Sequence, residues 1–241
     1  MEPWKRGPRI HKLEMKKKTQ PGFSVLELII VVTIVLIVAA MAAPLVMNST
    51  NNYRLRTAGT EYANLLQTAR MKAVQDDQFY PVIVPSSGNM SACVDLNMSG
   101  TCDAPVGAEP GVAFHGTIQF QGYSVAPAVN ALRGLYLPAT CANGGNNSSC
   151  VTVNPSSWGP TFGPRGLPCQ AAALALGGAC TLLSASGTAG DNGSPGSLPI
   201  AFEKYLKNTQ NGTWEAITVS PAGRIREWYY DPSSTSWKPL N

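Results

Sequence analysis

The stretch that decides the fold is the apolar run Phe23–Ala43, FSVLELIIVVTIVLIVAAMAA, which is followed by Pro44. Only Ser24, Glu27 and Thr33 interrupt it. A helix of these 21 residues rises about 31 Å, close to the roughly 30 Å hydrocarbon core of a bilayer. The sequence therefore predicts a helix that spans a membrane once.

The charges around this run are unevenly distributed. The first 22 residues hold seven of the 18 Lys and Arg and two of the 14 acids, a net charge of +5, whereas the rest of the chain carries −1. A basic segment before the run keeps the N-terminus cytoplasmic and sends the C-terminal part across the membrane. Because the remainder is not basic, a protein that coats nucleic acid is excluded. With 44% apolar residues the chain is also not intrinsically disordered.

Glu27 separates three interpretations of the run. An ordinary signal peptide would be cut after the small residues Ala40-Met41-Ala42, and a signal anchor would not be cut. In neither case does the carboxylate of Glu27 have a partner, and an unpaired charge in hydrocarbon costs roughly 2.5 to 3.5 kcal/mol. The third interpretation supplies the partner.

The segment KKKTQPGFSVLE, residues 16–27, resembles the class III leader of type IV pilins and pseudopilins. In that family a dedicated peptidase cuts after the glycine and methylates the new N-terminal residue, so the resemblance implies a cut between Gly22 and Phe23. Glu27 then becomes the fifth mature residue, where the family carries its glutamate. The ammonium of Phe23 in one subunit would neutralise Glu27 of a neighbour, and one buried polar pair per subunit would fix the axial register of the helices.

The helical pattern continues beyond the apolar run, but there it is one-sided. Small and apolar residues recur every three or four positions between 48 and 75, and charged residues lie between them. These apolar positions are Leu55, Ala58, Tyr62, Leu65, Leu66, Ala69 and Ala73. The prediction is an α+β fold in which one long N-terminal helix, transmembrane in its first half and amphipathic in its second, packs on an antiparallel β-sheet head. The predicted parts are a leader 1–22, a transmembrane helix 23–44, an amphipathic helix 45–78 and a head 79–241.

Short β-like runs separated by Gly, Pro, Ser and Asn make up the head. The predicted strands cover 79–84, 112–120, 198–203, 214–220 and 224–230. Residues 140–199 are rich in loop formers, and we expect them to leave the sheet as a long excursion without a core of their own.

Six cysteines lie at 93, 102, 141, 150, 169 and 180. In an exported chain an even number indicates disulfides, although six cysteines allow fifteen connectivities. We favour the sequential pairs Cys93–Cys102, Cys141–Cys150 and Cys169–Cys180, because each closes one loop. A zinc site is disfavoured by the absence of a C-x-x-C motif and of a nearby histidine.

Catalytic motifs are missing from the sequence. The histidines are His11, which lies in the predicted leader, and His115, which lies in a strand-like run where a structural role is expected. No phosphate-binding loop or zinc-hydrolase motif occurs. The sequence therefore predicts a protein that is not an enzyme and that needs no metal or cofactor.

One basic motif stands near the C-terminus, in SPAGRIREWYYD, residues 220–231. Period-two alternation places Arg224, Arg226, Trp228 and Tyr230 on one face of a strand. Together with FGPRGLP, residues 162–168, this ending resembles minor pilins and pseudopilins of the GspH/FimT type, and some pilus members with Gly-Arg-x-Arg are linked to DNA capture. Guanidiniums beside aromatic rings can contact phosphates and stack on bases. The alternative is a terminal hairpin with solvated arginines.

Three functions follow as hypotheses. The first is a minor pilin or pseudopilin subunit of a type II secretion pseudopilus or a type IV pilus. The second is a type IV pilus subunit that contacts DNA during uptake through Arg224, Arg226 and Trp228. The third is a signal-anchored binding protein outside the cytoplasm. The first two imply a prepilin peptidase, other pilin subunits and inner-membrane lipid as partners, and a head in the periplasm or in an extracellular filament.

Overall fold

The computed structural model describes residues 24–84, 91–102, 109–137, 151–153, 158–169 and 200–240. The chain divides into two compact units, Met1–Leu45 and Val46–Asn241. The helix α1 (Val25–Asp76) begins in the first unit and ends in the second. It is α-helical on both sides of Pro44, so no turn is unwound at the proline.

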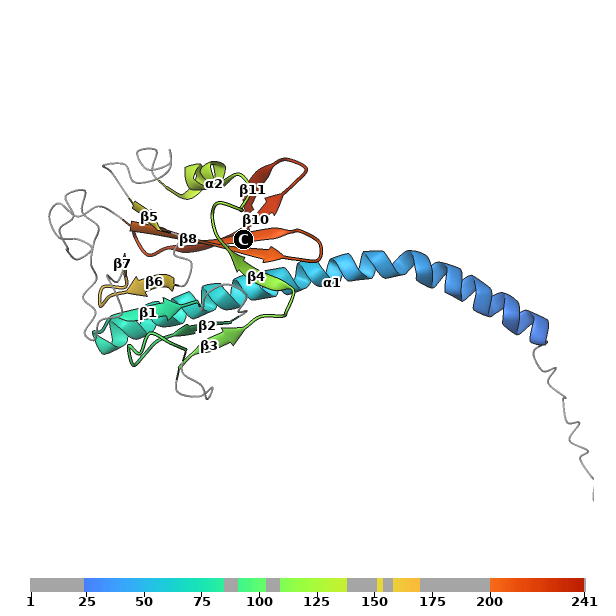
Figure 1. Ribbon diagram of the computed structural model, residues 1–241, viewed down its shortest axis with the longest axis horizontal. Coiled ribbons are helices and arrows are strands. Elements are labelled where there is room, and N and C mark those ends of the chain that lie inside the picture. The colour runs from blue at the N-terminus through green and yellow to red at the C-terminus, as the bar shows by residue number, and fades with distance from the viewer. Residues whose placement is uncertain are drawn as a thin grey trace, which may run out of the picture. The chain divides into compact units, whose positions relative to one another are not determined.

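The head contains two sheets (Figure 1). The first is antiparallel, with strand order β3-β2-β1-β6-β7. Its strands are β1 (Tyr80–Ile83), β2 (Ser91–Val94), β3 (Gly111–Ala113), β6 (Trp158–Phe162) and β7 (Pro168–Cys169). The second has the order β11-β10-β9-β8-β4, and β5 pairs with β8 as a parallel neighbour. Its strands are β4 (Ile118–Gln121), β5 (Val151–Val153), β8 (Ile200–Asn208), β9 (Trp214–Val219), β10 (Ile225–Asp231) and β11 (Ser236–Pro239).

The main core lies where the head part of α1 meets both sheets. All seven apolar positions of the predicted helical stripe are buried there, which confirms the amphipathic second half of the helix. The first sheet contributes Val82, Val94 and Phe162, and the second contributes Ile217 and Val219. A single helix therefore holds two sheets together.

Polar contacts fasten the beginning of the head helix to the second sheet. The Asn208 amide donates to the carbonyl oxygen of Asn51 (2.9 Å), and the Thr60 hydroxyl donates to Glu227 (3.0 Å). Glu215 is only 1% exposed, and its two carboxyl oxygens have no hydrogen-bond partner among the described residues. A Cβ built on Gly59 would stand 1.9 Å from Oε1 of Glu215, so only glycine leaves room for this carboxyl group. Burial, followed by the charge of Glu227, raises the pKa of Glu215 to about 9.

A second core covers the opposite face of the second sheet. The helix α2 (Val129–Tyr136) places Leu132 against Trp228 and Trp237. The guanidinium of Arg133, on the same helix, forms a buried ion pair with the carboxylate of Glu203. The second sheet is thus sandwiched between α1 and α2.

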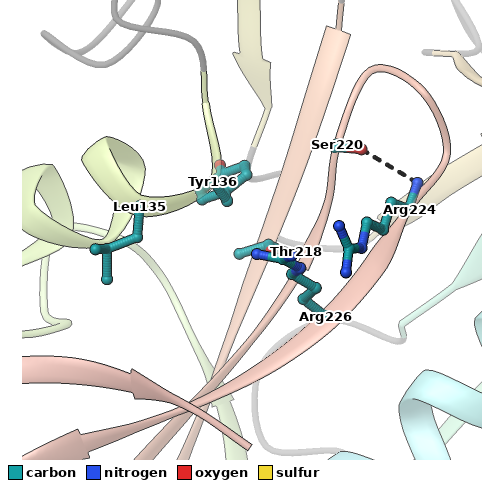
Figure 2. A pocket seen from close by; sticks show the side chains of 6 residues that line it. All are labelled: Leu135, Tyr136, Thr218, Ser220, Arg224 and Arg226. Atoms are coloured by element: carbon teal, nitrogen blue, oxygen red, sulfur yellow. Dashed lines mark hydrogen bonds between the residues drawn. The ribbon is translucent and has the colours of Figure 1, made fainter. Parts of the chain in front are cut away.

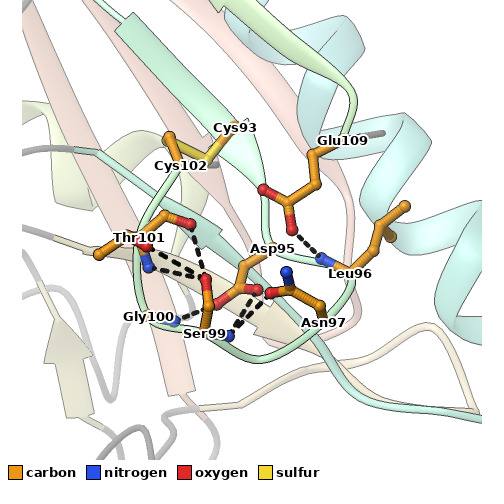
Figure 3. The surroundings of a disulfide bond; sticks show 9 residues. All are labelled: Cys93, Asp95, Leu96, Asn97, Ser99, Gly100, Thr101, Cys102 and Glu109. Carbon is orange, nitrogen blue, oxygen red and sulfur yellow. Dashed lines mark hydrogen bonds between the residues drawn. A yellow bond between two sulfur atoms is a disulfide. The ribbon is translucent and has the colours of Figure 1, made fainter. Parts of the chain in front are cut away.

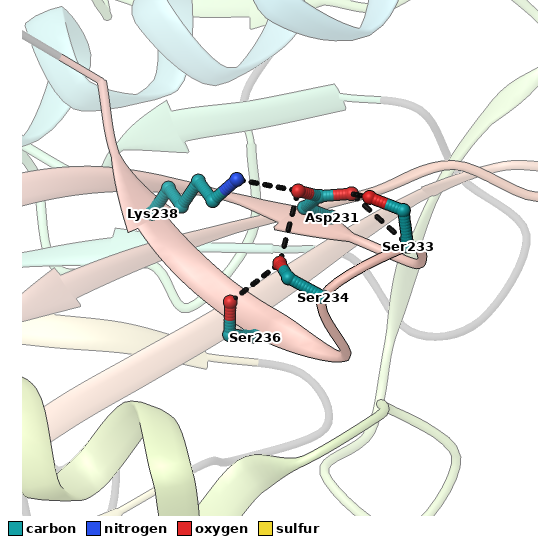
Figure 4. A network of polar contacts seen from close by, with 5 residues as sticks. All are labelled: Asp231, Ser233, Ser234, Ser236 and Lys238. Carbon is teal, nitrogen blue, oxygen red and sulfur yellow. Dashed lines mark hydrogen bonds and ion pairs between the residues drawn. The ribbon is translucent and has the colours of Figure 1, made fainter.

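Two polar networks order loops of the head. In the loop after β2, the disulfide Cys93–Cys102 closes a turn in which the Asp95 carboxylate accepts the amides of Ser99 (3.0 Å) and Gly100 (2.7 Å) (Figure 3). In the β10–β11 turn the Asp231 carboxylate accepts hydrogen bonds from Ser233, Ser234 and Lys238 (Figure 4). These contacts, led by the ammonium of Lys238, lower the pKa of Asp231.

The strand predictions need two corrections. Residues 112–120 are not one strand, because the chain turns at His115–Ile118, where the Ile118 amide donates to the His115 carbonyl (2.8 Å), and passes from β3 in one sheet to β4 in the other. Residues 140–199 are not wholly an excursion, since β5, β6 and β7 lie within them and β6 occupies an inner position of the first sheet. The sequence also has a weak helical pattern at 170–176, and these residues lie outside the described part of the chain.

Candidate functional site

The first candidate site is the beginning of α1. Glu27 lies in its first turn, where a negative charge is favoured by the helix dipole. Among the residues that the structure describes, the Glu27 carboxylate makes no hydrogen bond or ion pair, and the apolar side chains that follow it are exposed. Leu28, for example, is 59% exposed. An acid without a partner on an uncovered apolar helix is suited to contacts outside its own chain.

α1 is long and apolar enough to cross a membrane. Its most apolar window has a mean hydropathy of 3.0, and none of that window is buried. A signal sequence near an N-terminus has the same properties, so hydropathy alone does not choose among the three interpretations of the run. Gly22 and Phe23 lie outside the described residues, and the cut between them stays a prediction.

The second candidate site is the β9–β10 hairpin. Its turn is closed by hydrogen bonds from the Gly223 amide to the Ser220 carbonyl (2.8 Å) and from the Arg224 amide to the Ser220 hydroxyl (3.1 Å). Gly223 has a φ of +77°, which favours glycine. The turn therefore fixes the start of the strand that carries Arg224 and Arg226.

β10 presents its two faces as the alternation predicts. Tyr229, Glu227 and Ile225 face α1, where the Arg56 guanidinium carbon lies 5.8 Å from the centre of the Tyr229 ring. Trp228 and Tyr230 belong to the second core on the opposite face. The predicted common face of the arginines and the two aromatic residues is therefore present.

The prediction that Trp228 contacts bases of DNA needs a correction. It is 2% exposed, and its indole Nε1 donates to the Thr218 hydroxyl (2.9 Å). The Arg226 guanidinium carbon lies 5.9 Å from the centre of its ring. In this conformation the ring cannot stack on a base, because the core already covers it. It is a residue of the second core.

Arg224 and Arg226 line an open pocket of about 240 Å³ between α2 and the hairpin (Figure 2). The other lining residues are Leu135, Tyr136, Thr218 and Ser220. Neither arginine forms an ion pair with a carboxylate of the described residues. Burial, followed by the charge of Glu203, raises the pKa of Tyr136, and its phenol donates to Glu203 (3.2 Å). Two unpaired guanidiniums beside hydroxyl groups suit an anion such as a phosphate.

The remaining predicted residues are the cysteines and His115. The disulfide Cys93–Cys102 agrees with the first sequential pair, and Cys169 is also disulfide-bonded. Cys141, Cys150 and Cys180 lie outside the described residues, so the other two pairs stay predictions. His115 is exposed and its Nδ1 lies 3.1 Å from the Thr117 hydroxyl. In the described part of the chain no group of three His, Cys, Asp or Glu could hold a metal ion.

The comparison with protein families concerns the first site. Residues 17–43 match the family described as the prokaryotic N-terminal methylation motif. The N-terminal segment is type IV pilin-like. The motif implies processing by a prepilin peptidase and assembly with other pilins, and it agrees with the prediction of a structural subunit that is not an enzyme. Among curated proteins, none matches the chain.

Two solved structures are similar to the chain, both of the type IV minor pilin FimU from Pseudomonas aeruginosa. The first has 15% identity and a TM-score of 0.41, and the match covers 80% of this chain and 96% of FimU. The second, in another space group, has 17% identity and a TM-score of 0.37, with 78% and 98% covered.

Sequence reasoning missed part of the second site. It did not predict α2, which supplies Leu135 and Tyr136 to the pocket. The signal was present, because Val129, Leu132, Leu135 and Tyr136 are spaced three, three and one residues apart, as on a helix face. Thr218 could not have been found, since its position beside Arg226 depends on the pairing of β9 with β10.

Proposed function

We propose that the chain is a minor pilin or pseudopilin subunit that is cut between Gly22 and Phe23, methylated at Phe23 and assembled into a filament through α1. The observation that carries the proposal is the methylation motif at 17–43, which includes the exposed apolar beginning of α1 and Glu27 in its first turn. The ammonium created at Phe23 would pair with Glu27 of a neighbouring subunit. The pair offsets the desolvation of both charges and selects one axial register.

Intact mass of the chain extracted from membranes tests the processing. We expect a chain that starts at Phe23 and carries one added methyl group. A chain that starts at Met1 or at Ala43 would refute the proposal in favour of a signal anchor or a signal peptide.

A Glu27→Gln variant tests the pairing. It keeps the size of the side chain and removes its charge, so we expect normal cleavage but loss of the chain from sheared filaments and from complexes with other subunits. Glu61→Gln, on the exposed side of the head helix, is the matched control and should assemble like the unmodified chain. Assembly of the Glu27→Gln variant at the unmodified level would show that the charge pair has no role.

We propose DNA contact as a second function, supported by the pocket that holds Arg224 and Arg226 without a carboxylate partner among the described residues. Phosphates of the DNA would contact the two guanidiniums, and the DNA strand would lie along the exposed side of the hairpin. The test compares binding of a labelled single-stranded oligonucleotide by the unmodified chain and by Arg224→Ala and Arg226→Ala. Absence of binding, or equal binding by all three, refutes this function and leaves the assembly proposal untouched.

A further inference from the structure

Two turns that are far apart in the sequence touch each other in the head. The β6–β7 turn, residues 163–167, belongs to the first sheet, and the β9–β10 turn belongs to the second. A Cβ built on Gly223 would stand 2.6 Å from the carbonyl oxygen of Gly166, so the two backbones are in direct contact. Both glycines have positive φ, +69° and +77°.

Arg70 of α1 contacts both turns where they meet. Its Nη1 donates to the Gly223 carbonyl (2.9 Å), and its Nε would lie 3.1 Å from a Cβ built on Gly166. The guanidinium is thus packed against both turns and serves as a positioning residue. The partly buried side chain of Arg70 therefore fixes the two turns relative to each other.

The contact brings a third arginine, Arg165, to the second site. Arg165 precedes Gly166 and Arg224 follows Gly223, and both side chains are exposed. Because standard backbone lengths link each arginine to the 2.6 Å contact, the Cα atoms of Arg165 and Arg224 are no more than about 14 Å apart. That is about four nucleotides of a stacked strand at 3.4 Å each.

The nearby carboxylates do not neutralise these arginines. On β8 and β10, Glu203 pairs with Arg133 in the second core, Glu227 accepts from Thr60 on the α1 side, and Asp231 pairs with Lys238. Each of these carboxylates therefore already has a partner.

We propose that Arg165 belongs to the same polyanion-binding surface as Arg224 and Arg226, so that a single DNA strand crosses both turns and is held by arginines from both sheets. This inference rests on the proposed DNA contact and extends it to a residue outside the Gly-Arg-x-Arg motif.

The test measures fluorescence anisotropy of a labelled oligo(dT) of about 20 nucleotides with the full chain in detergent, over a range of salt. Each phosphate contact on a single strand contributes about 0.7 to the slope of log affinity against log salt. For Arg165→Ala we expect the slope to fall by about 0.7, with binding weakened about eightfold near 50 mM salt and about threefold near 200 mM. Arg165→Lys keeps the charge and should bind nearly as the unmodified chain does.

The control is Arg54→Ala on the head part of α1, well before Arg70 in the sequence, which should change neither the affinity nor the slope. A thermal melt confirms that Arg165→Ala folds, as an exposed turn residue should. If the unmodified chain binds and Arg224→Ala weakens binding but Arg165→Ala does not, Arg165 lies outside the surface and only this inference fails. If the unmodified chain does not bind, the proposed DNA contact fails together with it.

Discussion

The buried carboxyl group of Glu215 makes the stability of the head depend on pH. Its pKa is about 9 in the folded chain, against an ordinary value of 4.5. The unfolded chain therefore releases this proton first, and the stability that is present below pH 4.5 is lost progressively as the pH rises to about 9. At pH 7 the loss is on the order of 3 kcal/mol, since each pH unit above 4.5 contributes about 1.4 kcal/mol.

Glu215→Gln removes this proton and should flatten the pH dependence. We expect the variant to be more stable than the unmodified chain by about 3 kcal/mol at pH 7 and nearly equal to it at pH 4. The assay is urea unfolding in mild detergent at several pH values, followed by fluorescence of the buried Trp214, Trp228 and Trp237. Glu61→Gln, which changes an exposed acid, is the control and should keep the slope of the unmodified chain.

The same pH slope in Glu215→Gln and in the unmodified chain would refute the reasoning, because the carboxyl group would then be ionised or solvated in the folded head. Lys204 does not confuse the comparison. Burial lowers its pKa to about 8, so its contribution to the slope lies above pH 8 and is common to both chains.

Three further substitutions test the packing of the head by the same unfolding assay. Gly223→Ala should cost about 2 kcal/mol or more, because φ is positive and a backbone oxygen stands 2.6 Å from the new Cβ; an unchanged midpoint would contradict the turn contact. Glu203→Gln leaves the buried charge of Arg133 without its counter-charge, and we expect the free energy of unfolding to fall by about 3 kcal/mol. A fall of less than about 1 kcal/mol would show that the ion pair is solvated. Replacing Cys93 and Cys102 together by serine should cost about 2.5 kcal/mol by the chain-entropy model, and a reducing agent should destabilise the unmodified chain more than this variant.

Periodic patterns made the first part of the chain predictable. The helix in the run 23–43 needs only composition and length, and the stripe from Leu55 to Ala73 needs only the helical repeat. The structure has the helix from Val25 onward and buries the stripe. The alternation on β10 also predicted which side chains share a face. It did not predict their exposure, because the cover over Trp228 comes from α2, a helix far away in the sequence.

Non-local pairing explains what the sequence left undetermined. The β-like run at 112–120 looks like one strand. Gly116 could signal an interruption, but nothing local reveals that the turn at His115–Ile118 moves the chain from one sheet to the other. The loop-rich stretch 140–199 likewise hides β6, whose five residues lie between β1 and β7. The meeting of Gly166 with Gly223 depends on both sheets and on Arg70, and no local signal marks it.

The dependence of the head on its last strands has a consequence for biogenesis. The apolar stripe of α1 leaves the ribosome early, yet it is covered by β9 and β10, which are among the last segments to be made. Until those strands have been made, the side of the stripe that they cover stays open to water and to other nascent chains, which favours aggregation or capture by a chaperone. Contacts of such large sequence separation also form slowly. A truncation before β9 should therefore leave an anchored chain without a closed head, a substrate for proteolysis at the membrane surface.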